Sequence, residues 1–249
     1  MLFFKRILDV KNSKASSERR GGSRYVVQPG FPVKTALNIT SRDEFGEPIP
    51  AQSMDWVSRL VDLSAAGARV QVPRTVVAQR GDACRLKIDV QGYLLEVPAA
   101  IAHVADRRDS FLFGLALDLG ASRTQAAFRQ LVELVALGST LKQLRPLQPD
   151  ASGYLVEEYT GEPSSRLVIW RQLVGREVAA FEFQLKDCLV RGLSGRDGVE
   201  CFPGTEAAGA RRATGAKGEE IRRLYQWVVL NLAPAVPADV RDFLQRHAA

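Results

Sequence analysis

Apolar and polar residues alternate along much of the first half of the chain, with the period of two expected of a half-buried strand. Between Val33 and Ile39, every second residue is apolar or β-branched, and lysine, alanine and asparagine lie between them. Further strands are indicated at 56–63, 68–72, 84–90, 93–104 and 111–117, with a Gln91-Gly92 turn and a loop at 41–52. About six strands with short connections predict a small closed or nearly closed antiparallel β-barrel rather than a βαβ fold.

A helical period follows the last of these strands. Ser122 and Gln125 have the S-x-x-Q spacing of a capping box. Apolar residues then recur at i, i+3, i+4 and i+7, at positions Phe128, Leu131, Val132 and Val135. We expect Gly138 to end this helix as its C-cap and the apolar face to cap the barrel.

The second half of the chain begins with a break rich in proline. Residues 145–153 contain Pro146, Pro149 and Gly153, which is typical of a linker. Strands are expected at 154–159, 166–172, 177–185 and 188–193, before a flexible loop at 204–218. A helix from Glu219 and a short one after Pro237 complete the pattern.

These patterns predict a mainly β protein with some helix, divided into four parts. Residues 1–17 form a flexible basic arm, and residues 18–144 form the barrel domain with its capping helix. The linker at 145–153 leads to an α+β domain of unknown role at 154–249. A length of 249 residues agrees with two domains rather than one.

Composition narrows the classes of protein to consider. Hydrophobic residues make up 46% and charged residues 25%, which is ordinary for a soluble globular protein. No apolar run is long enough for a transmembrane helix, and residues 1–8 are too short and too charged for a signal peptide. The expected location is therefore the cytoplasm.

The cysteines and histidines argue against metal and nucleophile chemistry. Cys84, Cys188 and Cys201 are odd in number and widely spaced, so neither a disulfide framework nor a zinc site is expected. His103 and His247 are the only histidines, and we expect each to be structural or exposed. No carboxylate pair, nucleophile–base set or P-loop stands out, so we do not expect an enzyme or a metal cofactor.

Positive charge is concentrated at the start of the chain. The formal net charge is +6, and residues 1–24 hold seven basic residues against two acidic ones, an excess of five. Such a basic segment indicates an anionic partner, which could be a nucleotide, a nucleic acid or a membrane surface.

Two short motifs carry groups suited to a phosphorylated guanine ligand. Arg20 and Arg24 form an RxxxR pair around Gly21, Gly22 and Ser23, and an arginine can grip a phosphate bidentately or pair with guanine O6 and N7. The second motif is a DxSxxG turn formed by Asp62, Ser64 and Gly67. Its carboxylate can accept hydrogen bonds from guanine N1 and N2, its hydroxyl can donate to phosphate, and its glycine permits a tight turn.

In this order, and followed by the strand pattern above, the two motifs resemble the PilZ domain, a bacterial receptor for cyclic di-GMP. The resemblance covers roughly residues 18–140 and does not extend to the C-terminal part. It implies that Arg20, Arg24, Asp62, Ser64 and Gly67 bind cyclic di-GMP, and that Arg69 contributes from the end of the turn. In the family, an arginine at the position of Arg19 accompanies a stacked pair of cyclic di-GMP molecules, so a dimeric ligand is expected.

The resemblance implies a non-enzymatic receptor in which the arm folds over the ligand and reorients the C-terminal domain toward a downstream protein partner. Two alternatives stay open: a nucleic-acid-binding β-barrel that uses the basic arm, and a PilZ-like scaffold that binds proteins without a ligand. The regulated process and the oligomeric state are not fixed by the sequence, which is compatible with a homo-oligomer.

Overall fold

The computed structural model describes residues 22–42, 48–120, 123–162, 164–205, 209 and 211–248. The predicted arm at 1–17, together with Arg19 and Arg20, lies outside the described residues. The contacts within the chain divide it into two compact units, with the division between Val132 and Glu133.

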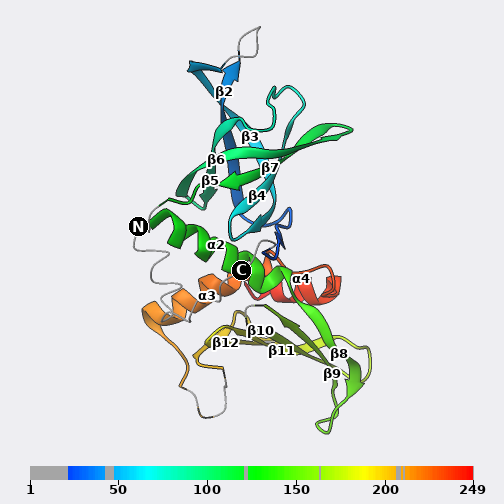
Figure 1. Cartoon of the computed structure of the whole chain (residues 1–249). Helices are drawn as coiled ribbons and strands as arrows, with labels where there is room; N and C mark the ends of the chain where they lie inside the picture. The colour runs from blue at the N-terminus through cyan, green and yellow to red at the C-terminus, as the bar shows by residue number, and fades with distance from the viewer. Residues whose placement is uncertain are drawn as a thin grey trace. The chain divides into compact units, whose positions relative to one another are not determined.

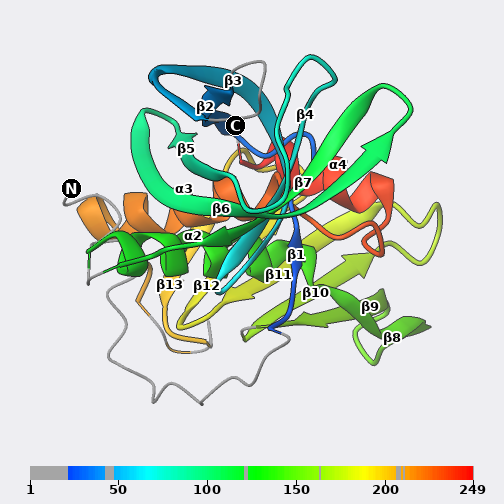
Figure 2. The ribbon, with the colours of Figure 1, turned by 45° about the horizontal axis from the view of Figure 1, so that its top comes forward.

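The N-terminal unit is a closed antiparallel β-barrel, as the alternating pattern predicts. Its ring has the strand order β3-β2-β5-β6-β7-β4, and β3 pairs with β4 to close it, while β1 adds to the free side of β3. The ring can be followed in Figures 1 and 2. The strands are β1 Tyr25–Val26, β2 Val33–Arg42, β3 Pro48–Ser64, β4 Gly67–Pro73, β5 Ala83–Val90, β6 Tyr93–Arg107 and β7 Ser110–Leu117.

The barrel core consists of the apolar residues that alternate along the strands. Leu37, Leu86, Val97 and Phe113 are fully buried because every second side chain of a strand points inward. The expected turn at Gln91-Gly92 is present, with φ of 52° and 85°, the positive pair that a two-residue hairpin favours. The loop expected at 41–52 is shorter than predicted, because β2 runs to Arg42 and β3 begins at Pro48.

Helix α2, Arg123–Ser139, follows the barrel and crosses the division between the two units. Its start agrees with the predicted one, although Ser122 is outside the described residues. The sequence predicts Gly138 as the C-cap of this helix. The structure contradicts this prediction, because Gly138 lies inside the helix, one residue before its last residue. A Cβ at this position would lie 2.8 Å from the carbonyl oxygens of both Val228 and Asn231. Glycine is therefore needed because the backbone after α3 packs directly against it.

The C-terminal unit is an antiparallel sheet with helices on one face, in agreement with the predicted α+β region (Figure 1). The strand order β13-β12-β11-β10-β9-β8 is a simple meander. The elements are β8 Lys142–Pro149, β9 Leu155–Gly161, β10 Ser165–Arg171, β11 Val178–Leu185, β12 Cys188–Leu193, β13 Glu200–Pro203, α3 Gly215–Val229 and α4 Ala238–Arg246.

Where we predicted a linker at 145–153, the structure has a strand and a turn. Residues up to Pro149 belong to β8, which pairs with β9 only, and the Asp150 carboxylate accepts hydrogen bonds from the backbone of Ser152 and Tyr154 at 2.9 and 3.0 Å. Proline is tolerated on an edge strand because one side of that strand makes no ladder bonds. The two prolines thus mark the edge of the sheet and not a break between domains.

Aromatic stacking fixes the helices on the sheet. The Phe181 ring of β11 stacks on Tyr225 of α3 at 5.6 Å and meets Phe243 and His247 edge-on. Gly192 of β12 leaves room for this ring, since a Cβ there would lie 2.2 Å from it. As expected, His247 has a packing role, and His103 is exposed.

The cysteines, the helices and the potential metal ligands of the described residues can also be examined. All three cysteines are free. No helix in the described part of the chain is long and apolar enough to cross a membrane. Within those same residues, no group of three or more His, Cys, Asp or Glu side chains could hold a metal ion.

Candidate functional site

A β-bulge sets the direction of Asp62. On β3, Leu60 pairs with Val70 of β4 and Asp62 pairs with the next residue, Arg69, so Val61 has no partner of its own. The extra residue turns Leu60 and Leu63 both into the core, while Asp62 faces outward beside Arg69. Simple alternation would have placed Asp62 on the inner face with Leu60.

Asp62 is a buried carboxylate held between two exposed arginines. Its Oδ1 accepts a hydrogen bond from Arg24 Nη1 at 2.9 Å, and its Oδ2 accepts one from Arg69 Nε. The Asp62 side chain is 1% exposed, whereas those of Arg24 and Arg69 are 46% and 43% exposed. The guanidinium groups therefore cover the carboxylate and present one net positive charge to solvent, the arrangement that an anionic ligand needs.

The DxSxxG turn joins β3 to β4 next to this cluster. Ser64 pairs with Gly67, and the buried Ser64 hydroxyl donates to the Gly67 carbonyl at 3.3 Å. A Cβ on Gly67 would lie 2.9 Å from the carbonyl oxygen of Leu115 and 3.9 Å from Nη2 of Arg24. Glycine thus allows β4 to approach β7 closely at the point where Arg24 crosses the turn.

Gly67→Ala is expected to destabilise the barrel by about 1–3 kcal/mol, because the added methyl group overpacks against backbone that cannot move alone. Urea unfolding of the two proteins measures this difference. Gly114→Ala on β7 is the matched control, since its Cβ would make an ordinary 3.4 Å contact with His103. Equal losses for the two variants would contradict the steric argument.

The pairing register extends the site beyond the predicted residues. Arg69 pairs with Gly114 of β7, and Gly114 pairs with His103 of β6, so the exposed His103 lies in the same row as Asp62 and Arg69. In the next row, Arg59 donates to Gln71 Oε1 at 2.7 Å. No sequence pattern indicates these neighbours, because they depend on the register of strands far apart in the chain.

The predicted site residues thus fall into two groups. Arg24, Asp62, Ser64, Gly67 and Arg69 lie together at one corner of the barrel. Arg19 and Arg20 are not among the described residues. The ligand-binding role of all seven stays a prediction.

The family comparison decides the class of the first domain, because residues 17–137 match the family model described as PilZ domain. This part of the chain is a PilZ domain. PilZ domains are a family of cyclic di-GMP receptors. The match ends inside α2, so it does not cover the C-terminal sheet.

No curated protein sequence matches the chain. Among solved structures, the chain is similar to the crystal structure of the Borreliella burgdorferi PlzA protein in complex with c-di-GMP, at 10% sequence identity. The match covers 82% of this chain and 93% of that one, with a TM-score of 0.28.

Proposed function

We propose that this protein is a cyclic di-GMP receptor whose ligand binds at the corner of the PilZ domain formed by Arg24, Asp62 and Arg69. The observation that carries the proposal is the buried Asp62 carboxylate between two half-exposed guanidinium groups, beside a complete DxSxxG turn. The site offers guanidinium donors for the phosphates and for guanine O6 and N7, held in place by a carboxylate.

The chemistry of binding follows from the groups present. Arg24 and Arg69 can turn their free N–H groups toward a phosphate or toward guanine O6 and N7 while Asp62 keeps them in place. Arg20 adds a second guanidinium four residues before Arg24, and Ser64 and Gly67 border the other side of the ligand. Arg19 favours a stacked pair of cyclic di-GMP molecules over a single one.

The output of the receptor is a change in the C-terminal part, without any catalysis. The arm becomes ordered around the ligand, and the conformational entropy lost in this step lowers the affinity. The same ordering repositions residues 154–249 for a downstream protein partner. Helix α2 provides the covalent route, because it is continuous across the division between Val132 and Glu133.

Calorimetric titration of cyclic di-GMP into the full chain tests the proposal. We expect binding near two nucleotides per chain, with GTP as the control ligand that does not compete. One nucleotide per chain would keep the receptor and contradict the stacked pair. No heat and no competition would overturn the receptor, and steeply salt-dependent binding of random oligonucleotides would then favour a nucleic-acid-binding barrel.

A further inference from the structure

The C-terminal sheet has one face that the PilZ chemistry does not use. Helices α3 and α4 pack on the opposite face, where they contact Phe181. Among the described elements of the C-terminal unit, none lies over the remaining face (Figure 1). We call this surface the open face, and its side chains are arranged in rows because the strands are paired in a regular register.

Three rows cross the open face. The charged row follows the register from β8 to β13 and consists of Arg145, Glu158, Val168, Glu182, Arg191 and Glu200. The apolar row lies next to it and consists of Gln148, Val156, Trp170, Ala180 and Leu193. The third row, on the other side, consists of Lys142, Thr160, Arg166, Gln184, Leu189 and Phe202.

The charges of the open face are paired within the chain, and the arginines of these pairs reach solvent. Glu158, 6% exposed, accepts from Arg166 Nε at 2.5 Å and lies 3.7 Å from Arg145, and both arginines are more than half exposed. The hydrogen bond from Arg166 keeps the pKa of Glu158 below its usual value. Arg191 pairs with Glu182 and lies over the ring of Phe202. These pairs hold the signs of the charged row in fixed places.

The order of signs in the charged row complements itself when it is reversed. From β8 to β13 the row is positive, negative, neutral, negative, positive, negative. Facing a reversed copy, Arg145 meets Glu200, Glu158 meets Arg191, and Val168 meets Glu182. No two like charges meet in this alignment.

Alignments shifted by one strand bring like charges together, and larger shifts leave part of the row unmatched. A shift of one strand places Arg145 against Arg191 and Glu158 against Glu182, and a shift the other way places Glu182 against its own copy. A two-fold axis along the row would set every charge on itself. Only a two-fold axis parallel to the strands, midway between Val168 and Glu182, satisfies the whole row.

From this match we propose that the open face binds the open face of a second copy of this chain, forming a symmetric dimer through the C-terminal sheets. A two-fold contact uses the same patch on both copies, which is the self-complementarity that the row displays. Face-to-face sheets stack about 10 Å apart with their strands nearly aligned, so long arginines at the row ends can reach their partners. This dimer is independent of the proposed ligand.

The same two-fold axis also brings the side chains of the apolar row into contact across the two copies. Trp170 faces Ala180 of the second copy, and Val156 faces Leu193. A hollow of about 240 Å³, bordered by Val156, Val168 and Trp170, offers room for a side chain from the other copy. Large residues thus meet small ones, as a packed interface requires.

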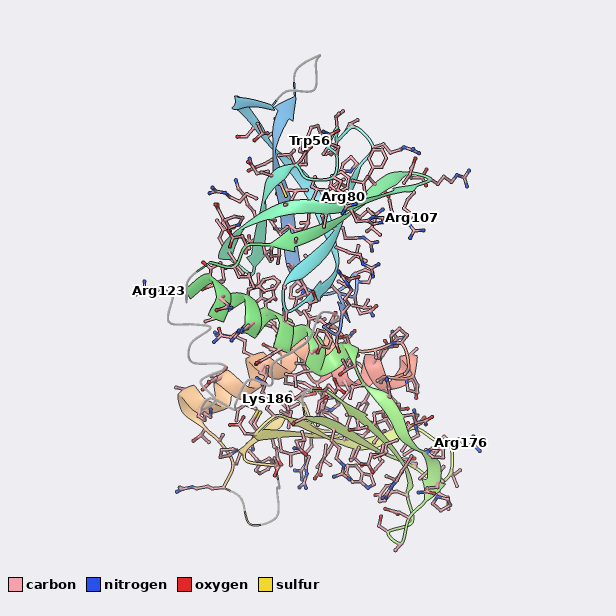
Figure 3. All side chains as sticks on the ribbon, in the orientation of Figure 1. Trp56, Arg80, Arg107, Arg123, Arg176 and Lys186 are labelled. Atoms are coloured by element: carbon pink, nitrogen blue, oxygen red, sulfur yellow. The ribbon has the colours of Figure 1, made fainter. Side chains whose placement is uncertain are left out.

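Exposed apolar residues extend the patch at the end of the sheet nearest the apolar row. Leu173 and Val174 are 58% and 84% exposed in the turn between β10 and β11, where Figure 3 labels Arg176. Tyr154 is 40% exposed in the neighbouring turn between β8 and β9. Because the axis passes between β10 and β11, the turn that holds Leu173 and Val174 meets the same turn of the second copy. The turn that holds Tyr154 meets the connection between β12 and β13.

The size of the open face determines the affinity that we expect for the dimer. Six strands about 4.8 Å apart make a row about 24 Å wide. The three rows hold about 17 residues a side, against the 20–30 of a standard interface, and four of them, Glu158, Val168, Leu189 and Phe202, are buried within the chain. We therefore expect a dissociation constant on the order of micromolar. Because the contacts are ionic as well as apolar, added salt should weaken the dimer.

A charge-exchange experiment tests the proposal on the full chain. Sedimentation velocity across the micromolar range should show a concentration-dependent dimer. Arg145→Glu and Glu200→Arg should each weaken self-association at least about tenfold, because each turns two cross-copy attractions into repulsions. An equimolar mixture of the two variants should associate as tightly as the original chain, since Glu at 145 then faces Arg at 200.

The mixture separates a lost contact from a damaged fold, because two misfolded proteins would not restore one another. Arg222→Glu on α3 is the matched control and should leave association unchanged, as it reverses an exposed, paired arginine away from the open face. The proposal is overturned if the chain stays monomeric at every concentration. It is also overturned if both single variants dimerise as tightly as the original chain. A mixture that does not regain association overturns it as well.

Discussion

Asp62→Ala is expected to reduce the affinity for cyclic di-GMP by about 100-fold or more, which is the largest effect we predict on ligand binding. The substitution removes the anchor that holds both Arg24 and Arg69 in place for the ligand. A charge-assisted hydrogen bond from each arginine to the ligand is worth about 1.5–3 kcal/mol, so the loss of both gives at least about 3 kcal/mol. Calorimetric titration measures the change.

A second variant and a control separate binding from folding. Asp62→Asn keeps the shape of the side chain but can accept through one oxygen only, so we expect it to bind weakly and to unfold close to the original chain. Asp106→Ala is the matched control, because Asp106 pairs with Arg74 on the same barrel and is exposed. Unchanged affinity in Asp62→Ala would exclude this corner as the ligand site.

Arg171→Ala is expected to destabilise the C-terminal unit by about 3–5 kcal/mol, because it leaves a buried carboxylate without its cation. Arg171 Nε donates to Glu157 Oε1 at 2.7 Å, and the two side chains are 9% and 5% exposed. Nη1 donates to Asp239 of α4 and to the Arg176 carbonyl, and its bond keeps the pKa of Asp239 below the usual value. The same substitution therefore also frees α4 from the sheet.

Urea unfolding, followed by far-UV circular dichroism, measures this loss. Arg222→Ala is the control, since its exposed pair with Glu219 lies within three residues of one helix and contributes at most about 0.5 kcal/mol. Replacing both Arg171 by methionine and Glu157 by leucine should recover most of the stability, because an apolar pair leaves no charge buried alone. A loss below about 1 kcal/mol in Arg171→Ala would contradict the role given to the cluster.

The sequence predicted the barrel well because its evidence is local. Alternation along each strand, the Gln91-Gly92 turn and the period of α2 are properties of neighbouring residues, and each agrees with the structure. The C-terminal strands and helices were also located within a few residues, apart from β13 and the edge strand β8. The prediction of a linker in place of β8 was wrong because proline is common both in linkers and in edge strands.

The candidate site could be predicted only in part. The residue types and spacing of the two motifs identified Asp62, Ser64 and Gly67, but they did not indicate which face of β3 Asp62 occupies. Its outward direction depends on the bulge at Val61, which exists because β4 pairs with both sides of it. The row that brings His103 toward Arg69 likewise depends on the register of distant strands.

By itself, then, the sequence determined which segments form strands and helices and which motif residues the PilZ domain carries, since periodicity and motif spacing are local properties. Tertiary structure decided the rest. Gly138 supports close packing instead of ending a helix, because the chain after α3 returns to the same point. The charged row of the open face has no trace in the sequence, because its six residues come from six strands and meet only through strand pairing.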